Sequence, residues 1–442
     1  MMRILLWSAS VLVLPVSILW WLGQLARHFS ILRRADVVII DPHMLNFGLN
    51  LIGIDIARRL FPDRNVVYFF SWEPGASQNI LIGSIWTDIT VLLLRRANFL
   101  ITILGRSEYL PLPKLTIPLL GPLARVFLRL IAWKADIRLY GELFGNIPVP
   151  PELEDLIPHD YSMFERYGRI AQALWWSMAN NYPSPPPTFP QHEKATIHTL
   201  LEKVRGGKSA RLCMMHNKVV SAERAEGREG SNMAAYLPAI RMLVDEGCQV
   251  MLVGDKTLED EMFDSFAGMV VDATRLGVDH QLFRLFAPLE AEICIGDGGS
   301  GLILPGIRGI PMLVLNAYPV AHIGGLGAKS WVYPKRHTDK ATGKPIPTET
   351  IFRDDPFGCL VPPENKPFLS QPHPNTEEEI TEAVRCFLAD LAHPVNDDPG
   401  GELIELLPRE SGFRISGARL SPAFVRHNRA EKNQIKSKLV SA

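Results

Sequence analysis

The chain has 442 residues, of which 47% are hydrophobic and 21% are charged, and its formal net charge is -1. This composition is typical of globular proteins and excludes a disordered chain, and the length predicts about two domains. The neutral charge balance gives no support to nucleic acid as a partner. The cysteines, at positions 213, 248, 294, 359 and 386, form no C-x-x-C pair, so neither a disulfide framework nor a zinc site is expected.

Residues 1–27 are predicted to be a membrane anchor. Residues 4–22 are apolar apart from three serines and one proline, and a run of about 20 such residues can span a bilayer. A cleaved signal peptide is the alternative, but no clear A-x-A site follows, and Trp20 and Trp21 stand where an aromatic belt is expected. Positive charge is heavier after the run than before it: Arg27, Arg33 and Arg34 against Arg3. The positive-inside rule therefore predicts a single-pass protein of the inner membrane whose main part is cytoplasmic.

Residues 35–181 are predicted to form a first doubly wound α/β domain. Short, continuously apolar runs typical of buried parallel strands occur at residues 36–41, 65–70 and 99–104. A helix is expected at residues 80–96. Asp41 ends the first predicted strand and His43 lies just beyond it, where either side chain could act as a general base on a substrate hydroxyl.

Two proline-rich segments follow. Prolines interrupt the first half of residues 110–134, whereas residues 122–134 could form either an amphipathic helix on a membrane surface or an internal helix of the first domain. Residues 182–190 contain five prolines in nine positions, which neither a helix nor a central strand accommodates. The segment 182–192 is therefore predicted to be a stiff linker between two domains.

Residues 193–400 alternate strands and helices more regularly. Strands are expected at residues 211–216, 249–253, 269–271, 292–295 and 311–315. Helices are expected at residues 193–204, 233–246, 258–266, 279–290 and 302–308. This alternation predicts a second Rossmann-like, doubly wound domain. Further on, we expect loops at residues 322–374, a helix at 376–391 capped by Thr376, and a C-terminal tail at 401–442 that is disordered after Val425.

The turn Asp297-Gly298-Gly299-Ser300-Gly301, directly after a predicted strand, is the best candidate ligand site. Its glycines permit tight turns and close approach of backbone to a ligand. Ser300 and Gly301 would open the next helix, whose free N–H groups favour a phosphate. An ordinary strand-to-helix turn is the alternative. The run is neither a P-loop nor the dinucleotide fingerprint, so ATPase and dehydrogenase functions lose support.

Other polar residues and one glycine of this domain follow predicted strand ends or open a helix. They are His216, Lys218, Arg224, Arg228, Gly254, Asp255, His280 and Asn316. The cations after the first strand could neutralise a diphosphate, although a solvated loop of mixed charge is the alternative, and Asn316 could bond a sugar or base. No D-x-D triplet occurs in the chain, so we expect a site that uses neither a metal nor another cofactor.

The residues at 232–240, 250–255, 299–305 and 309–316 resemble, in order and spacing, a bacterial family of surface-polysaccharide glycosyltransferases with GT-B-like architecture. Two positions depart from that family. Leu49 stands where its first-domain loop has a histidine, and Asn217-Lys218 follow His216 where it has His-x-Arg. The resemblance implies that the second domain binds a nucleotide-sugar, that the first binds the acceptor, and that a sugar is transferred to a lipid-linked or cell-surface polysaccharide.

Two other functions remain open at this point. A nucleotide-sugar 2-epimerase shares the two-domain architecture but needs no lipid and no anchor. A non-catalytic, membrane-tethered protein that binds a nucleotide-sugar would tolerate the departures at Leu49 and Asn217-Lys218.

Overall fold

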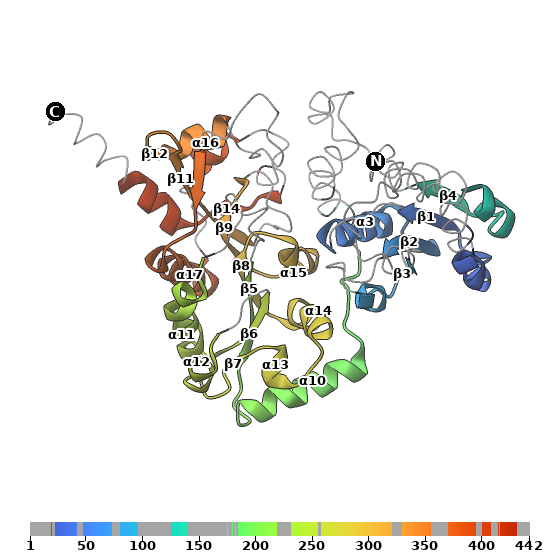
Figure 1. Ribbon diagram of the computed structural model, residues 1–442, viewed down its shortest axis with the longest axis horizontal. Helices are drawn as coiled ribbons and strands as arrows, with labels where there is room; N and C mark the ends of the chain where they lie inside the picture. Colours follow the sequence, from blue (N-terminus) through green and yellow to red (C-terminus); the bar gives the residue numbers. More distant parts are fainter. Residues whose placement is uncertain are drawn as a thin grey trace, which may run out of the picture. The chain divides into compact units, whose positions relative to one another are not determined.

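The computed structural model describes residues 19, 23–41, 47–72, 80–95, 125–139, 175, 179, 182, 184–218, 231–254, 258–320, 329–354, 370–394, 400–407, 414 and 416–430. The chain divides into two compact units, each built on a parallel sheet (Figure 1). The first unit comprises Met1–Pro148 and Asn181–Thr188, and the second comprises Val149–Asn180 and Phe189–Ala442. The proline-rich residues up to Thr188 therefore belong to the first unit.

The first unit contains a four-stranded, wholly parallel sheet in the order β3-β2-β1-β4. Its strands are β1 (Val37–Asp41), β2 (Val66–Trp72), β3 (Ile89–Arg95) and β4 (Asp136–Leu139). Helix α3 (Phe47–Leu60) covers one face, and helical residues 23–27, α2 (Phe29–Leu32) and residues 125–131 cover the other (Figure 1). The sheet is doubly wound, as predicted, because β4 returns to the free side of β1.

The predicted helix at residues 80–96 is wrong. Residues Ile80–Ile85 form a short 3-10 helix, η1, and Ile89–Arg95 form β3 beside β2. Its run of isoleucine, threonine, valine and leucine suits a strand packed on both faces, and such runs cannot be told from buried helices by pattern alone. The predicted strand at 99–104 lies outside the described residues.

Most of the predicted anchor, residues 1–18 and 20–22, also lies outside the described residues. Within the described part of the chain, no helix has both the length and the hydropathy needed to cross a bilayer. Leu25, a residue of the predicted anchor, is fully buried in the core of the first unit. The globular unit therefore begins before residue 27.

The second unit contains a seven-stranded parallel sheet in the order β14-β10-β9-β8-β5-β6-β7. The strands are β5 (Arg211–Asn217), β6 (Cys248–Gly254), β7 (Val270–Val271), β8 (Ile293–Asp297), β9 (Met312–Ala317), β10 (Ser330–Pro334) and β14 (Arg419–Leu420). All five predicted strands of this unit are confirmed. Their apolar side chains form a core that is buried on both faces of the sheet.

Helices cover both faces of this sheet (Figure 1). One layer contains η5 (Met233–Tyr236), α11 (Leu237–Asp245), α12 (Asp260–Asp264) and α17 (Glu377–Ala392). The other contains α13 (Ala273–Leu276), α14 (His280–Glu290), η6 (Ser300–Leu302) and α15 (Ile303–Arg308), and α10 (Gln191–Val204) leads into the unit. Thr376 caps α17, as predicted: its hydroxyl accepts from the Glu379 N–H, and its own N–H donates to the Glu379 carboxylate.

Residues 322–374 are not only loops. Strand β10 lies in this region and joins the large sheet, and after it come β11 (Arg336–Asp339), β12 (Pro345–Ile346), α16 (Thr348–Asp354) and β13 (Ser370–His373). Strands β12-β11-β13 form a small antiparallel sheet. The prediction failed because these strands are short and largely polar, so their pairing leaves little hydrophobic pattern.

The C-terminal tail was also predicted wrongly as far as residue 430. After α18 (Gly401–Ile404), β14 adds the edge strand to the large sheet, and residues 422–430 are helical. The tail is held by polar contacts that its composition does not reveal. The Tyr333 hydroxyl lies 2.6 Å from Nδ1 of His427, and Arg426 donates to Glu382 over 2.6 Å.

The small sheet contains a histidine that should make folding sensitive to acid. His337 is 5% exposed, and burial, helped by the charges of Lys335 and His373, lowers its pKa to about 3. At pH values between the usual histidine pKa and this lowered pKa, the imidazole of His337 is protonated in the unfolded chain but not in the folded chain. We expect acidification from pH 7 to pH 5 to cost about 2 kcal/mol through this residue. His337→Gln should remove that part of the pH dependence in urea unfolding, whereas exposed His280→Gln should not; identical pH dependence in both variants would contradict this.

Candidate functional site

The site is built around the switch point of the large sheet. From β5 the chain continues to β6 and β7 on one side, and β8 then lies on the other side of β5. The connections after β5 and β8 therefore leave in opposite directions, and ligands of open α/β sheets bind in the crevice at such points. Strand β5 ends at Asn217 and β8 ends at Asp297. The residues after these two strands are those that the sequence singled out.

Asp297 is the centre of a buried hydrogen-bond network. Its Oδ1 accepts bonds from the Tyr236 hydroxyl and, over 2.6 Å, from Nδ2 of Asn316. Its Oδ2 accepts from the backbone N–H of Lys218 over 2.8 Å and from Nδ2 of Asn217 over 3.3 Å. Four donors thus converge on a carboxylate that is 2% exposed. Such a donor set suits the ionised form, because a carboxylate only accepts hydrogen bonds.

Burial sets the electrostatics of this network. Burial raises the pKa of Asp297, while the hydrogen bonds from Tyr236, Lys218 and Asn316 and the charge of Lys335 act in the opposite direction. The pKa of Tyr236 is raised well above its usual value, first by burial and then by the neighbouring carboxylate. Tyr236 is therefore a neutral donor at physiological pH, and it stabilises the carboxylate without carrying charge itself.

Asn316 connects the network to Asn375, which lies just before α17. It exchanges two bonds with Asn375, since the backbone N–H of each donates to the side-chain oxygen of the other over 2.6 Å. Ser231 donates to the backbone oxygen of Asn375 over 2.6 Å and lies 3.0 Å from Nδ2 of Asn316. Asn316 has a φ of 50°, a left-handed conformation that asparagine tolerates better than most residues. Strand β9 is thereby joined to the segment before α17.

The glycine turn packs directly onto residues from the end of β5. A Cβ atom at Gly301 would overlap the ring of His216, whose Nδ1 lies 3.3 Å from the backbone oxygen of Asp297. A Cβ atom at Gly299 would lie 3.5 Å from Cδ and 3.7 Å from Nζ of Lys218. The imidazole and the ammonium group therefore flank the turn, and the predicted group of His216, Lys218 and the glycines is brought together.

The surface of this turn suits an anion. Ser300 is exposed, and Gly298, Gly299 and Gly301 are partly exposed, so backbone at the turn can approach a ligand closely. Asp297 and Asn316 are 2% and 5% exposed and bonded within the network. Both residues were predicted to contact the ligand, but they lie beneath the turn and hold it in place. The glycines, Ser300 and Lys218 form the accessible part.

A small cavity of about 20 Å³ lies beside the turn, at the carboxyl ends of β9 and β10. Lys335, Arg336 and His337 line it together with Ala317, and a Cβ atom at Gly298 would lie 3.8 Å from Cα of Ala317. A volume of that size holds about one water molecule. The cavity brings the positive charge of Lys335 near the turn, whereas Arg336 is paired with Glu379 over 2.9 Å.

Other predicted residues are placed elsewhere or lie outside the described residues. Gly254 has a φ of 143°, and a Cβ atom there would overlap the backbone oxygen of Asn217, so packing between β5 and β6 already explains this glycine. The Nε2 atom of His280 lies 3.4 Å from the Thr274 hydroxyl on α13, and no contact with the Asp297 network is seen. The structure does not describe His43, Arg224, Arg228 or Asp255.

The first unit has a switch point of its own, between β1 and β4. Asp41 is the last residue of β1 and therefore lies at this point. Away from this point, the C-terminal half of α3 carries a buried ion-pair cluster in which Asp55 pairs with Arg58 over 3.3 Å and with Arg59 over 2.8 Å. These arginines also donate to backbone oxygens of Pro185 and Tyr182, so they fix the proline-rich segment to this unit.

Sequence reasoning missed several residues of the network: Tyr236, Asn217 as a bonding partner, Ser231, Asn375 and Lys335. Their partners are distant in the sequence; Tyr236 and Asp297 are 61 positions apart. Tyr236 did fall within the stretch on which the family resemblance rests. Asn375 and Lys335 gave no signal of this kind.

No protein-family model matches the chain, and no curated protein is detectably similar in sequence. Among solved structures, a glycosyl transferase family 9 protein from Veillonella parvula is 11% identical, with a TM-score of 0.45, over 80% of this chain and 98% of that one. E. coli heptosyltransferase WaaC with ADP is 13% identical, with a TM-score of 0.37, over 67% and 93%. The wall teichoic acid polymerase TagF is 12% identical, with a TM-score of 0.22, over 63% and 70%. Similarities of this size do not assign a function, which must follow from the chain's own residues.

The contact between Gly301 and His216 can be tested by a double-mutant cycle. Gly301→Ala should lower the free energy of unfolding by about 1–3 kcal/mol, because the methyl group overlaps the buried imidazole. In a His216→Ala background the ring is gone, so the same substitution should cost almost nothing. Gly298→Ala is the control, since its Cβ atom would meet Val314 at an ordinary 3.6 Å. An equal cost of Gly301→Ala in both backgrounds, measured by urea unfolding, would show that the ring does not pack there.

Proposed function

We propose that this protein is a glycosyltransferase that moves a sugar from a nucleotide-sugar to a lipid-linked or cell-surface polysaccharide acceptor. One observation carries the proposal: an accessible glycine turn lies at the switch point of the second sheet, held by a buried network and flanked by His216 and Lys218. A turn of this kind can bind a diphosphate through backbone N–H groups. The family resemblance of the sequence favours a nucleotide-sugar as the bearer of that diphosphate.

The second unit would bind the donor and stabilise the leaving group. In the reaction, the bond between the anomeric carbon and the diphosphate oxygen breaks, and the nucleoside diphosphate leaves with the bonding electrons. Backbone N–H groups of Gly299, Ser300 and Gly301 and the ammonium group of Lys218 would stabilise the charge that develops there. Arg224 and Arg228 remain predicted contributors. The lack of a D-x-D triplet favours a reaction without a bound metal.

The first unit would bind the acceptor. A base there takes the proton of the acceptor hydroxyl while the oxygen bonds to the anomeric carbon. Among the residues that the structure describes, we propose Asp41 as this base, because it ends β1 at the switch point. His43 follows it by two positions and is the alternative.

A membrane location suits this reaction. The apolar run at residues 4–22 would anchor the chain in the inner membrane with both units in the cytoplasm. There a cytoplasmic nucleotide-sugar and a lipid-linked acceptor are both within reach.

A non-catalytic binding protein is the second candidate. The observation in its favour is that Lys218 stands where the resembling family has arginine, and lysine cannot bind a diphosphate in bidentate fashion. Release of nucleoside diphosphate with sugar transfer to an acceptor would exclude it. Isomerisation of the nucleotide-sugar without acceptor would instead indicate a 2-epimerase.

Ser300→Glu tests the donor site. Because residue 300 is exposed, the variant should fold normally. The carboxylate of the introduced glutamate would face the diphosphate and weaken binding of a nucleoside diphosphate at least about tenfold. Calorimetric titration with a panel of nucleoside diphosphates, with and without EDTA, measures this and also tests for metal dependence. Ser265→Glu, at an exposed serine of the same unit, is the control. Unchanged binding in Ser300→Glu would remove the turn from the site.

A further inference from the structure

Four large hydrophobic side chains of the first unit are exposed on its outer helices and on the turn that follows residue 131. Val126, Leu130 and Trp133 are 62%, 77% and 70% exposed, and Phe29 is 47% exposed. Elsewhere among the described residues, exposed hydrophobic side chains of this size are few: Leu19, Tyr182 and Val204. Single exposed hydrophobic residues are ordinary, but a concentration of them marks an interaction surface.

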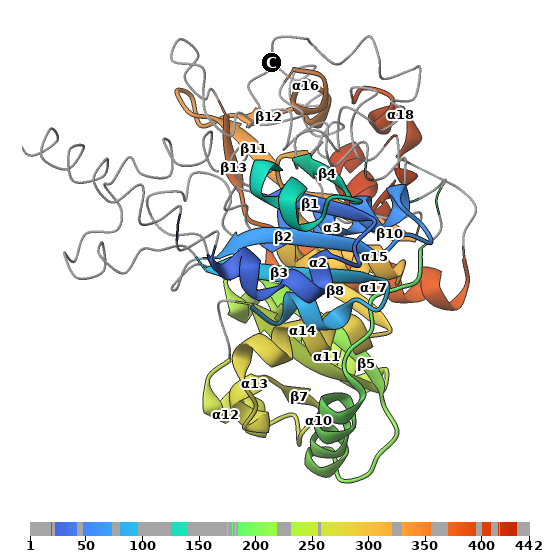
Figure 2. The same ribbon diagram turned by 90° about the vertical axis from the view of Figure 1, so that its right-hand side faces the viewer.

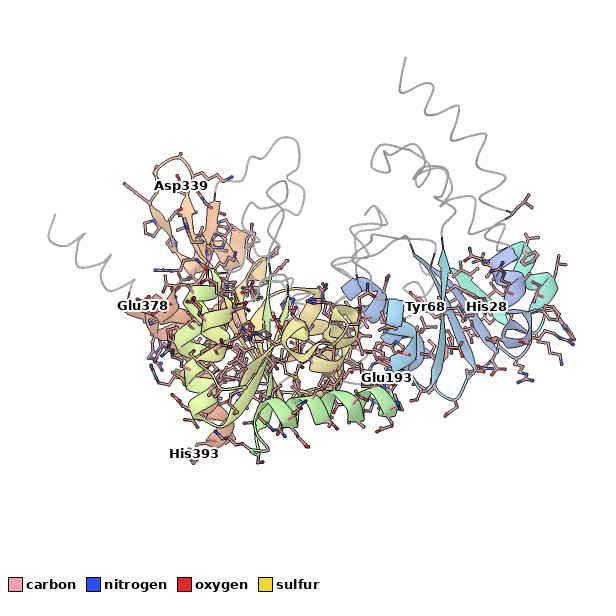
Figure 3. The ribbon with its side chains drawn as sticks, turned by 60° about the horizontal axis from the view of Figure 1, so that its bottom comes forward. His28, Tyr68, Glu193, Asp339, Glu378 and His393 are labelled. Carbon is pink, nitrogen blue, oxygen red and sulfur yellow. The ribbon has the colours of Figure 1, made fainter. Side chains whose placement is uncertain are left out.

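These side chains belong to one face of the unit. The helical residues 23–32 and 125–131 pack on the same side of the four-stranded sheet, away from α3 (Figures 2 and 3). Their inner side chains share one core cluster in which Leu25, Leu32 and Leu128 meet Val38 and Ile40 of β1. Because the inner side of each helix is used in this way, the exposed side chains lie on the outer side.

The charge of this face has a single sign. Its exposed charged residues are Arg27, Arg33, Arg34, Arg129 and Lys134. No aspartate or glutamate occurs among residues 1–35 or 109–135. The acidic residues that follow these segments are already bonded: Asp36 accepts from the Asn65 N–H over 2.9 Å, and Asp136 pairs with Arg138 over 2.7 Å.

Two contacts between a cation and an aromatic ring lie on this face. Nζ of Lys134 lies 5.0 Å from the centre of the Trp133 ring, and the guanidinium of Arg33 lies 5.6 Å from that of Phe29. Tryptophan beside lysine or arginine is favoured where a bilayer meets water, because the ring enters the headgroup layer while the cation stays with the phosphates.

We propose that the outer face formed by Phe29, Val126, Leu130 and Trp133, with its surrounding cations, binds the headgroup layer of an anionic membrane. A bilayer that contains anionic lipids supplies both a negative potential and an apolar layer over a broad surface, which matches the single-sign charge and the exposed rings. This contact is made by the folded first unit and is distinct from insertion of the apolar run at residues 4–22. It also does not depend on the proposed reaction.

Photocrosslinking in the full chain tests this face whether or not the N-terminal segment is inserted. We would introduce p-benzoylphenylalanine at Leu130 or at Trp133 and irradiate the protein with vesicles of about three parts phosphatidylcholine to one part phosphatidylglycerol. The expected result is a protein–lipid adduct detected by mass spectrometry. Thr87 is the matched control: it is exposed in the same unit, and its neighbour Trp86 lies under Arg58 of α3, on the opposite side of the sheet.

Lipid adducts at positions 130 and 133 no more abundant than at position 87 would overturn the proposal. A covalent protein dimer in place of the lipid adduct would overturn it as well and would assign the face to a second copy of the chain. The double substitution Arg129→Glu with Lys134→Glu should lower the adduct yield at position 130 about tenfold; an unchanged yield would contradict the electrostatic part. Nucleotide binding measured on the same samples reports separately on the donor site.

Discussion

The second unit depends on one buried carboxylate. Asp297 accepts hydrogen bonds from four donors, which come from the end of β5, from η5 and from β9. A carboxylate buried away from water is stable in its ionised form only when its oxygens accept enough hydrogen bonds. All four donors are therefore needed to keep Asp297 ionised in this position. The loss of a single partner would leave the charge under-bonded and would cost about 1–3 kcal/mol or more. The geometry at the carboxyl ends of β5, β8 and β9 is thereby fixed as a unit.

The hydrogen bonds to Asp297 also explain why a glycine is needed at position 301 of the turn. The carboxylate holds the backbone of Lys218 next to β8, and His216 lies against the residues that follow Asp297. With the ring of His216 beneath Gly301 and the stem of Lys218 beside Gly299, the turn has no room for a side chain at Gly301. What remains accessible is backbone, one serine and one ammonium group, which is the composition of an anion site rather than of a pocket for an apolar ligand.

The sequence predicted what depends on local pattern. Strands β5 to β9 of the second unit are continuous apolar runs bounded by polar residues, and Thr376 caps its helix as its position indicated. It did not predict what depends on distant pairing. The run at Ile89–Arg95 became a strand because β2 lies beside it, and β11 and β13 pair with so few apolar residues that they leave no periodic signal. The site divided in the same way: the glycine turn, His216 and Lys218 were identified, whereas Tyr236 and Asn375 were not, because their partners are 61 and 59 positions away.

The central claim is that a nucleoside diphosphate binds at the turn after β8. Hydrogen–deuterium exchange of the full chain, with and without the tightest-binding nucleoside diphosphate, tests it directly because the claim concerns backbone N–H groups. The account predicts slower exchange in peptides that cover Gly298–Leu302 and the end of β5 at His216–Lys218, with no change in α10. Unchanged exchange at the turn, with protection confined to other parts of the chain, would contradict it.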